Sequence, residues 1–101
     1  MKNSFLHLKE TYGVVVNNNE VGFPLTKVLD IIDWYKENGL PIYGGDVYLK
    51  QGDRYIPSYD NWYFNKEDAK TDYLVESIEC AKNYVKNYPI ENGVLFVLIP
   101  N

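Results

Sequence analysis

The hydrophobic period of the sequence changes near residue 41, and this change limits the possible folds more than any other feature. Between residues 24 and 39, apolar side chains recur three and four positions apart, which is the spacing of one helix face. These side chains are Leu25, Val28, Leu29, Ile32 and Tyr35. Pro24 suits the first turn of such a helix, and Gly39 suits the position just past its end. After residue 41 the period falls to two, which is typical of a strand.

Residues 46–56 predict a β-hairpin with one apolar and one polar face. If Gln51 and Gly52 form a two-residue turn, Tyr48 lies opposite Tyr55, and residues opposite each other share a face. The predicted core face carries Val47, Leu49, Arg54 and Ile56. The predicted solvated face carries Asp46, Tyr48, Lys50, Asp53 and Tyr55. Pro57 confines the second strand to a sheet edge or ends it, and residues 61–64 are predicted to form a further strand.

The remaining segments complete an α+β prediction. A short helix is expected within the first ten residues, a short extended piece at 14–16 and a loop at 17–22. A second long helix is expected after Asn65, as its N-cap, and ends before Pro89. Residues 94–99 are continuously apolar, which predicts a buried central strand. We therefore expect one domain over residues 1–101, with a mostly antiparallel sheet of about four strands and two main helices on one face.

Composition argues against several classes of function. The net charge of −4 disfavours a nucleic-acid binder, which needs a basic surface for phosphates. One cysteine, Cys80, and one histidine, His7, cannot supply a zinc site, and no glycine-rich phosphate-binding motif is present. We therefore expect no metal and no cofactor. The absence of a signal peptide and of a long apolar run predicts no membrane contact and a cytoplasmic location.

Two acids leave an enzymatic alternative open. Asp46 and Asp60 lie on segments that the predicted hairpin makes neighbours, and paired carboxylates can hydrolyse glycosidic bonds. The alternative interpretation gives one acid a structural role at a turn and leaves the other on the surface. A small carbohydrate-binding or hydrolytic domain therefore remains an alternative. A domain that forms a homodimer through its exposed sheet face or edge strand is another.

The stretch "YDNWY" at residues 59–63 also has two possible interpretations. Asp60 and Asn61 readily fix turns through bonds to nearby backbone N–H groups. Tyr59, Trp62 and Tyr63 then either pack on the core or form an aromatic patch of the kind that anchors protein interfaces.

The chain resembles a family of small bacterial immunity proteins from polymorphic toxin systems. The resemblance rests on "GLPIYGGDVYL", "YDNWY", "ESIECAKNYVKNY" and "VLFVLIP", and it covers residues 21–99. It implies a protein without enzymatic activity that binds a cognate toxin and occludes its active site. It also implies that motif residues hold the fold more than they select the toxin. The predicted partner-binding residues are Asp46, Tyr48, Asp53, Tyr55, Tyr59, Asp60, Trp62 and Tyr63.

Overall fold

A computed structural model describes residues 5–17 and 19–100 of the chain. Its helices are α1 (Phe5–Tyr12), α2 (Leu25–Glu37) and α3 (Tyr73–Asn87), with a 3-10 turn, η1, at Lys66–Asp68. Its strands are β1 (Val14–Asn17), β2 (Glu20–Pro24), β3 (Ile42–Gln51), β4 (Arg54–Tyr63) and β5 (Val94–Pro100). The α+β prediction is confirmed, with five strands in the described part of the chain rather than about four.

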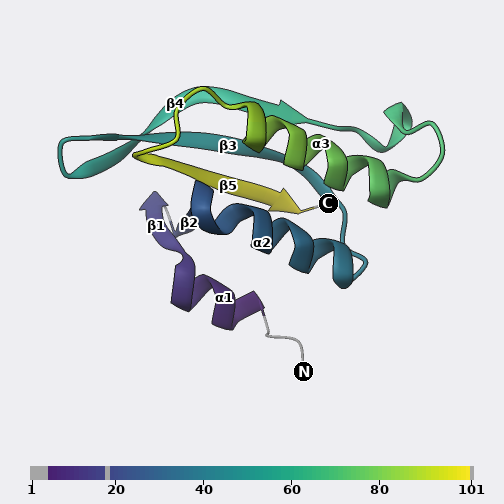
Figure 1. Ribbon diagram of the computed structural model, residues 1–101, viewed down its shortest axis with the longest axis horizontal. Helices are drawn as coiled ribbons and strands as arrows, with labels where there is room; N and C mark the ends of the chain where they lie inside the picture. Colours follow the sequence, from purple (N-terminus) through teal and green to yellow (C-terminus); the bar gives the residue numbers. More distant parts are fainter. Residues whose placement is uncertain (1–4, 18, 101) are drawn as a thin grey trace.

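The strands form one antiparallel sheet in the order β1-β2-β5-β3-β4. The additional strand β2 arises at the N-terminal side: residues 20–22, which the sequence predicts as part of a loop, pair with β1, and the following residues 23 and 24 pair with β5. At the other edge, residues on both sides of Pro57 belong to the single strand β4. Pro57 is tolerated there because an edge strand has a row of N–H groups without ladder partners. Figure 1 shows α2 and α3 running alongside this sheet, with α1 below them.

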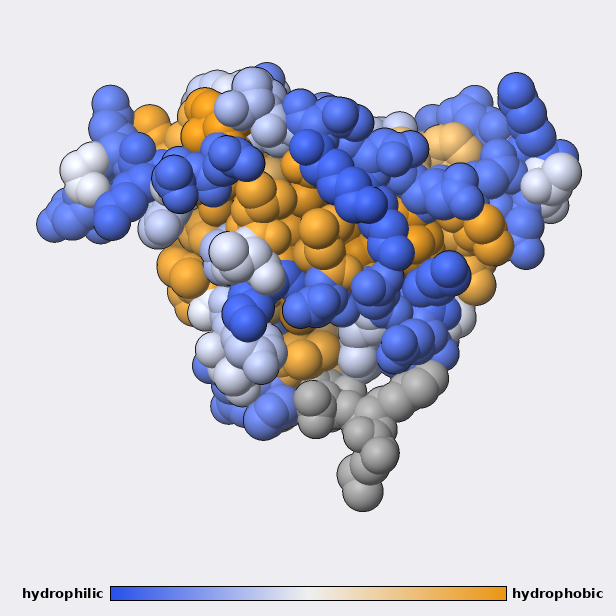
Figure 2. Space-filling view, viewed as in Figure 1, coloured by the Kyte–Doolittle hydropathy of each residue, from blue (hydrophilic) through white to orange (hydrophobic). Residues whose placement is uncertain are grey.

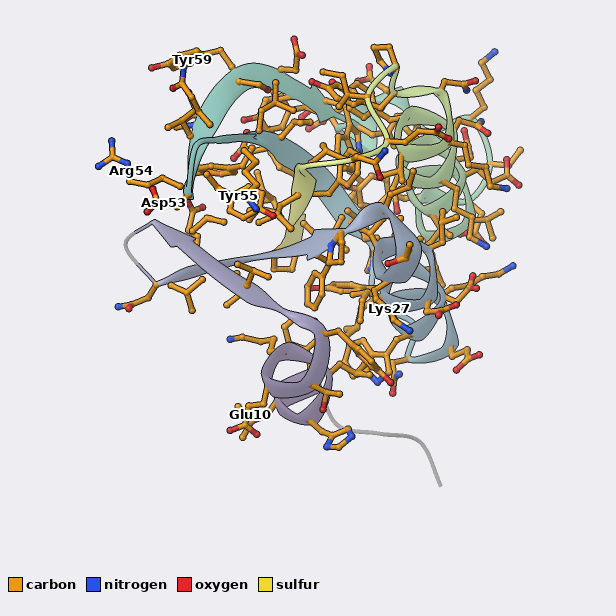
Figure 3. The ribbon with its side chains drawn as sticks, turned by 60° about the vertical axis from the view of Figure 1, so that its left-hand side comes forward. Glu10, Lys27, Asp53, Arg54, Tyr55 and Tyr59 are labelled. Carbon is orange, nitrogen blue, oxygen red and sulfur yellow. The ribbon has the colours of Figure 1, made fainter. Side chains whose placement is uncertain are left out.

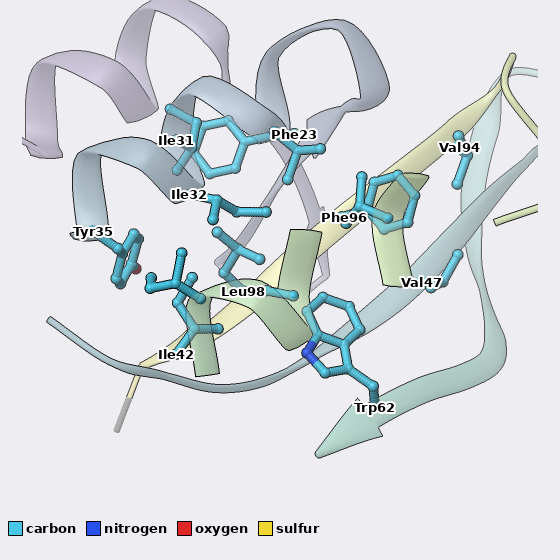
Figure 4. Close-up of a cluster of buried hydrophobic side chains, with 14 of the residues drawn as sticks. Phe23, Ile31, Ile32, Tyr35, Ile42, Val47, Trp62, Val94, Phe96 and Leu98 are labelled. Atoms are coloured by element: carbon cyan, nitrogen blue, oxygen red, sulfur yellow. The ribbon is translucent and has the colours of Figure 1, made fainter. Parts of the chain in front are cut away.

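The main core lies between the sheet and helices α2 and α3. Val28 and Ile32 of α2, Ile78 of α3 and Phe96 of β5 are at most 2% exposed. Figure 4 shows side chains from β3, β4 and β5 turned toward the same cluster as those of α2. The central position predicted for the last strand is confirmed, because β5 lies between β2 and β3 and its first five residues are buried. Continuous apolar sequence is expected for a strand covered on both faces.

Helix α1 packs against the same side of the molecule as α2. The Phe5 ring lies 5.2 Å from the Trp34 ring and 6.4 Å from the Phe23 ring, centroid to centroid. The N-terminal segment therefore covers Trp34, which lies outside the apolar arc of its own helix. Figure 2 shows hydrophobic residues across the middle of the face viewed in Figure 1, with hydrophilic residues along its rims.

The hairpin turn lies one residue later than the sequence predicts. Gln51 pairs with Arg54, so that Gly52 and Asp53 form the two-residue loop. Gly52 has a φ of +66°, which fits the turn type that places glycine first in the loop. Partners shift by two residues, so Tyr48 pairs with Pro57 instead of Tyr55. A shift of two preserves the faces, because strand side chains alternate with a period of two.

The start of the second long helix is also later than predicted. Asn65 precedes only the short η1 turn, and α3 begins at Tyr73 with Asp72 as its N-cap. The Asp72 carboxylate accepts a bond from the Val75 N–H. Glu76 accepts bonds from the backbone N–H groups of residues 70, 71 and 72. These bonds satisfy donors in a non-helical conformation, and they hold the segment before α3 as a loop.

We expect the Glu76 cap to make stability depend on pH in acid. The backbone N–H bonds from Lys70, Thr71 and Asp72 lower the pKa of Glu76 from 4.5 to about 2. A lowered folded-state pKa contributes stability above the unfolded value, and this contribution is lost as the pH falls from about 4.5 to about 2. Glu76→Gln should therefore lower stability at neutral pH and flatten the decline between those pH values. Urea unfolding at a series of pH values measures this, and parallel curves for both proteins would contradict it.

Candidate functional site

Two glycines of the "GGD" motif make room for Trp62. A Cβ atom built on Gly45 would lie 2.2 Å from Cη2 of the Trp62 ring, and one on Gly44 would lie 2.2 Å from the Trp62 carbonyl oxygen. The far side of the indole is occupied as well, because Trp62 stacks on Tyr84 of α3 at 4.7 Å. Trp62 is only 7% exposed. The structure therefore supports the interpretation in which Trp62 packs on the core and helps to determine the fold.

A bulge interrupts the pairing of β4 with β3 directly before Trp62. Tyr48 pairs with Pro57 and Asp46 pairs with Asn61, so that residues 58–60 lie opposite Val47 alone. The Ser58 hydroxyl donates to the Val47 carbonyl oxygen at 2.9 Å and accepts from the Asp60 N–H at 3.1 Å. The serine therefore bridges the gap that the extra residues leave in the ladder.

Tyr59 occupies the outermost position of this bulge. Its φ is +69°, a conformation that costs a non-glycine residue about 1–2 kcal/mol. Its side chain is 86% exposed, the highest value among the exposed large hydrophobic residues. Figure 3 shows Tyr59 projecting outward from the end of the molecule opposite to Glu10 on α1. A strained backbone that presents an exposed aromatic ring is more common at binding sites than elsewhere.

The two acids of the enzymatic alternative have different partners. The Asp60 carboxylate accepts a bond from the Tyr88 hydroxyl at 2.7 Å, at the end of α3. The pKa of Asp46 is raised by burial and by the negative charge of Glu20 on β2. A pocket of about 230 Å³ is lined by both Asp46 and Asp60. The structure therefore brings the two acids of the enzymatic alternative to one pocket, although each carboxylate interacts with a different neighbour.

Tyr48 is buried, and the prediction that it lies on a solvated face is wrong. Only 5% of it is exposed, and its hydroxyl donates to Glu20 Oε1 at 3.0 Å. It packs with Leu95 and Val97 of β5 in a small second cluster on the sheet face opposite α2 and α3, against which Val16 and Tyr55 also pack. The alternation of the hairpin gives the correct face for Tyr48. The alternation does not show that β1 and β2 extend the sheet beyond β5. Tyr48 is therefore buried in a cluster with Leu95 and Val97, against which Val16 of β1 also packs.

A groove of about 580 Å³ separates β1 from the tip of the hairpin. It is lined by residues 14–16 of β1, by Tyr48 and by residues 53–57. Asp53 and Arg54 are exposed at the tip, while Tyr55 is half-buried. Figure 3 shows Tyr55 between the hairpin and the β1–β2 ribbon. The groove is thus the place where two predicted contact residues, Asp53 and Tyr55, meet the exposed Val15 of the opposite edge strand.

The predicted contact residues therefore fall into groups by exposure. Asp53, Tyr59, Asp60 and Tyr63 are exposed, and Asp46 and Tyr55 are half-buried. Tyr48 and Trp62 are buried. All of them lie on β3, β4 or the turn between these strands.

Sequence reasoning did not identify a pocket beside the β4 bulge. This wide, open pocket of about 640 Å³ is lined by Asp60, by Cys80, Asn83, Tyr84 and Asn87 of α3, and by Tyr88 and Pro89 just after the helix. The helical residues are three and four positions apart, so their shared face could have been found from the spacing. The spacing does not show that Asp60, which is distant in the sequence, closes one side of this face.

The described residues offer no other evident chemical site. Among them, no group of three or more His, Cys, Asp or Glu side chains is placed to hold a metal ion. No helix within the described ranges is long and apolar enough to cross a membrane.

Comparisons with known proteins give a family. No curated protein and no solved structure matches the chain. The family described as Immunity protein 40 matches residues 8–100, which includes all five strands, both long helices and the motifs around Gly45 and Trp62. On this evidence the chain belongs to the Immunity protein 40 family.

Proposed function

We propose that this protein binds a cognate bacterial toxin in the cytoplasm and neutralises it by occluding the toxin's active site. The match to an immunity family over residues 8–100 is the observation that carries the proposal. No chemical step is needed from the chain itself. The proposed task is to present a rigid, complementary surface to one partner.

The contact surface that we propose is the exposed side of the β3–β4 hairpin. Tyr59 supplies its centre, because a large ring is exposed on a backbone already fixed by the bulge. Such a ring loses little conformational entropy on binding, and tyrosine is enriched among residues that dominate interface energy. Tyr63, which is 50% exposed, and Tyr55 extend the aromatic surface along β4.

The proposed surface carries acids at its bulge and both signs of charge at the hairpin tip, where Lys50 and Arg54 are exposed beside Asp53. Asp53 and Asp60 are exposed on this surface, and the net charge of the chain is −4. Acidic groups of this kind attract a basic partner and increase the rate of encounter. In this proposal Asp46, Tyr48 and Trp62 act mainly by holding the hairpin in place, since they are buried or half-buried.

We expect co-expression of this protein to protect cells from the toxin encoded beside its gene. Cells that make the toxin alone should lose viability, and cells that make both proteins should grow normally. The informative control is a toxin from an unrelated system, which this protein should not neutralise. Unrelieved toxicity at high expression of the soluble protein would contradict the proposal.

A further inference from the structure

The wide, open pocket beside the bulge presents side chains that suit a planar cation. Tyr84 and Tyr88 contribute two phenol rings with centroids 6.0 Å apart and an angle of 36° between them. Asp60 contributes a carboxylate, and Asn83 and Asn87 contribute amides. No lysine or arginine is among the residues that line the pocket. Aromatic faces and a carboxylate together attract positive charge, while nothing in this lining repels it.

The lining is held in place before any partner arrives. Tyr84 is supported by its stack on Trp62 at 4.7 Å, and Tyr88 meets the Phe96 ring edge-on at 5.7 Å. The Tyr88 hydroxyl donates to Oδ2 of Asp60, and the bulge fixes the Asp60 backbone through Ser58. A site built from groups that are already ordered binds with a smaller entropic cost.

Hydrogen-bond acceptors remain available for an incoming donor. The Tyr88 bond uses one of the two Asp60 oxygens. The Asn87 side chain donates from Nδ2 to the backbone carbonyl oxygen of Asn83 at 2.8 Å. This bond does not use the side-chain oxygen of Asn87. The negative charge is felt inside the pocket, because the pKa of Tyr84 is raised first by burial and then by Asp60.

We propose that this pocket receives an arginine side chain of the toxin, which stacks on Tyr84 and Tyr88 and pairs with Asp60. The inference rests on the proposed toxin-binding function. Arginine fits better than lysine because its planar guanidinium both stacks on rings and offers several donors in a fixed fork. The bulge then serves two purposes, because it turns Tyr59 outward and Asp60 toward α3.

The first test compares two variants that remove the same charge. Asp60→Asn keeps an acceptor for Tyr88 but removes the carboxylate, and it should weaken toxin binding at least about tenfold. Asp30→Asn on α2 removes an exposed acid outside the pocket, and it should change the affinity by less than about twofold. Calorimetry with the purified toxin domain measures both. If the toxin binds the wild type, and binds the two variants with equal affinity, the arginine pocket is overturned and the proposed function stands.

Cys80 provides a second readout that does not depend on affinity. It lines the pocket, is half-buried and is the chain's single cysteine. Burial raises the pKa of its thiol, so alkylation of the free protein should be slow enough to follow. Bound toxin should slow alkylation of Cys80 at least about fivefold, measured by mass spectrometry of this chain, because an inserted side chain blocks access. An unchanged rate in a saturated complex would overturn the inference, whereas absence of a complex would contradict the proposed function instead.

The toxin arginine itself can be found by a double-mutant cycle. Each arginine on the toxin surface is replaced by alanine and tested against wild type and Asp60→Asn. One replacement should weaken binding to the wild type at least about tenfold and have little further effect on the variant. If every replacement has the same effect against both proteins, no toxin arginine pairs with Asp60, and the inference is wrong.

Discussion

Replacing Gly45 with alanine is expected to destabilise the protein by about 3 kcal/mol, because the added methyl overlaps the buried indole of Trp62. The new Cβ would lie 2.2 Å, 2.4 Å and 2.8 Å from three atoms of that ring. The ring cannot retreat, since Tyr84 is stacked at 4.7 Å on its other side. Overpacking of this severity forces backbone movement in β3 or β4 instead of a simple rotamer change. Urea unfolding of the purified variant measures the loss.

A pair of controls separates this clash from the general effects of losing a glycine. Trp62→Ala alone should cost about 3–5 kcal/mol, and Gly45→Ala should add less than about 1 kcal/mol in that background. Gly39→Ala meets no atom within 4 Å, so its cost should be only the strain of φ +68°, about 1 kcal/mol. If Gly45→Ala lowers the free energy of unfolding equally in the wild-type and Trp62→Ala backgrounds, the methyl group does not clash with the Trp62 ring.

Tyr59→Gly is expected to make the protein more stable and a weaker inhibitor. Glycine adopts φ +69° without strain, and about 0.5–1 kcal/mol of stability should be gained after its greater unfolded-state entropy is deducted. Loss of the exposed ring should weaken toxin binding about 30-fold or more, which corresponds to at least about 2 kcal/mol. Thermal unfolding and calorimetry with the toxin domain measure the two effects separately.

Two further variants complete that experiment. Tyr59→Ala keeps the strained backbone and removes the ring, so it should weaken binding equally without the gain in stability. Tyr12→Ala removes an exposed tyrosine from α1, outside the β3–β4 hairpin, and should leave the affinity within about twofold. Equal binding by the wild type and both Tyr59 variants would show that the bulge is not part of the contact surface.

The elements of this fold that have a strong period could be predicted from the sequence. The arc that includes Val28 and Ile32 gives α2, and the uninterrupted apolar run gives β5 as a central strand. The grouping of the β3–β4 side chains into two faces is also correct, although the turn is displaced and Tyr48 on the predicted solvated face is buried. Either position of the turn places Gly52 in the loop, and the sequence pattern does not distinguish between them.

The missed features depend on contacts between distant segments. β2 begins in the residues that the sequence predicts as a loop, but Gly22 permits close approach to Leu95, where a Cβ would come within 2.9 Å. The burial of Tyr48 depends on Glu20, which is 28 residues away. The pocket on α3 likewise requires Asp60 to be turned by a bulge that no local pattern indicates.

Different residues of the two sequence motifs have different proposed roles. Gly44, Gly45 and Trp62 lock β3 to β4 and to α3. Tyr59 and Asp60, which directly precede that lock, are directed outward and toward the pocket. A rigid core motif can therefore be kept while neighbouring positions change to suit a different toxin.

Inhibition of the purified toxin domain by the purified protein shows directly whether this chain neutralises a toxin. Toxin activity is measured while the protein is added from zero to several equivalents, with Tyr59→Ala titrated in parallel. The wild type should abolish toxin activity near one equivalent, and Tyr59→Ala should require a much higher concentration. Full toxin activity in the presence of excess folded wild-type protein would contradict the proposed function.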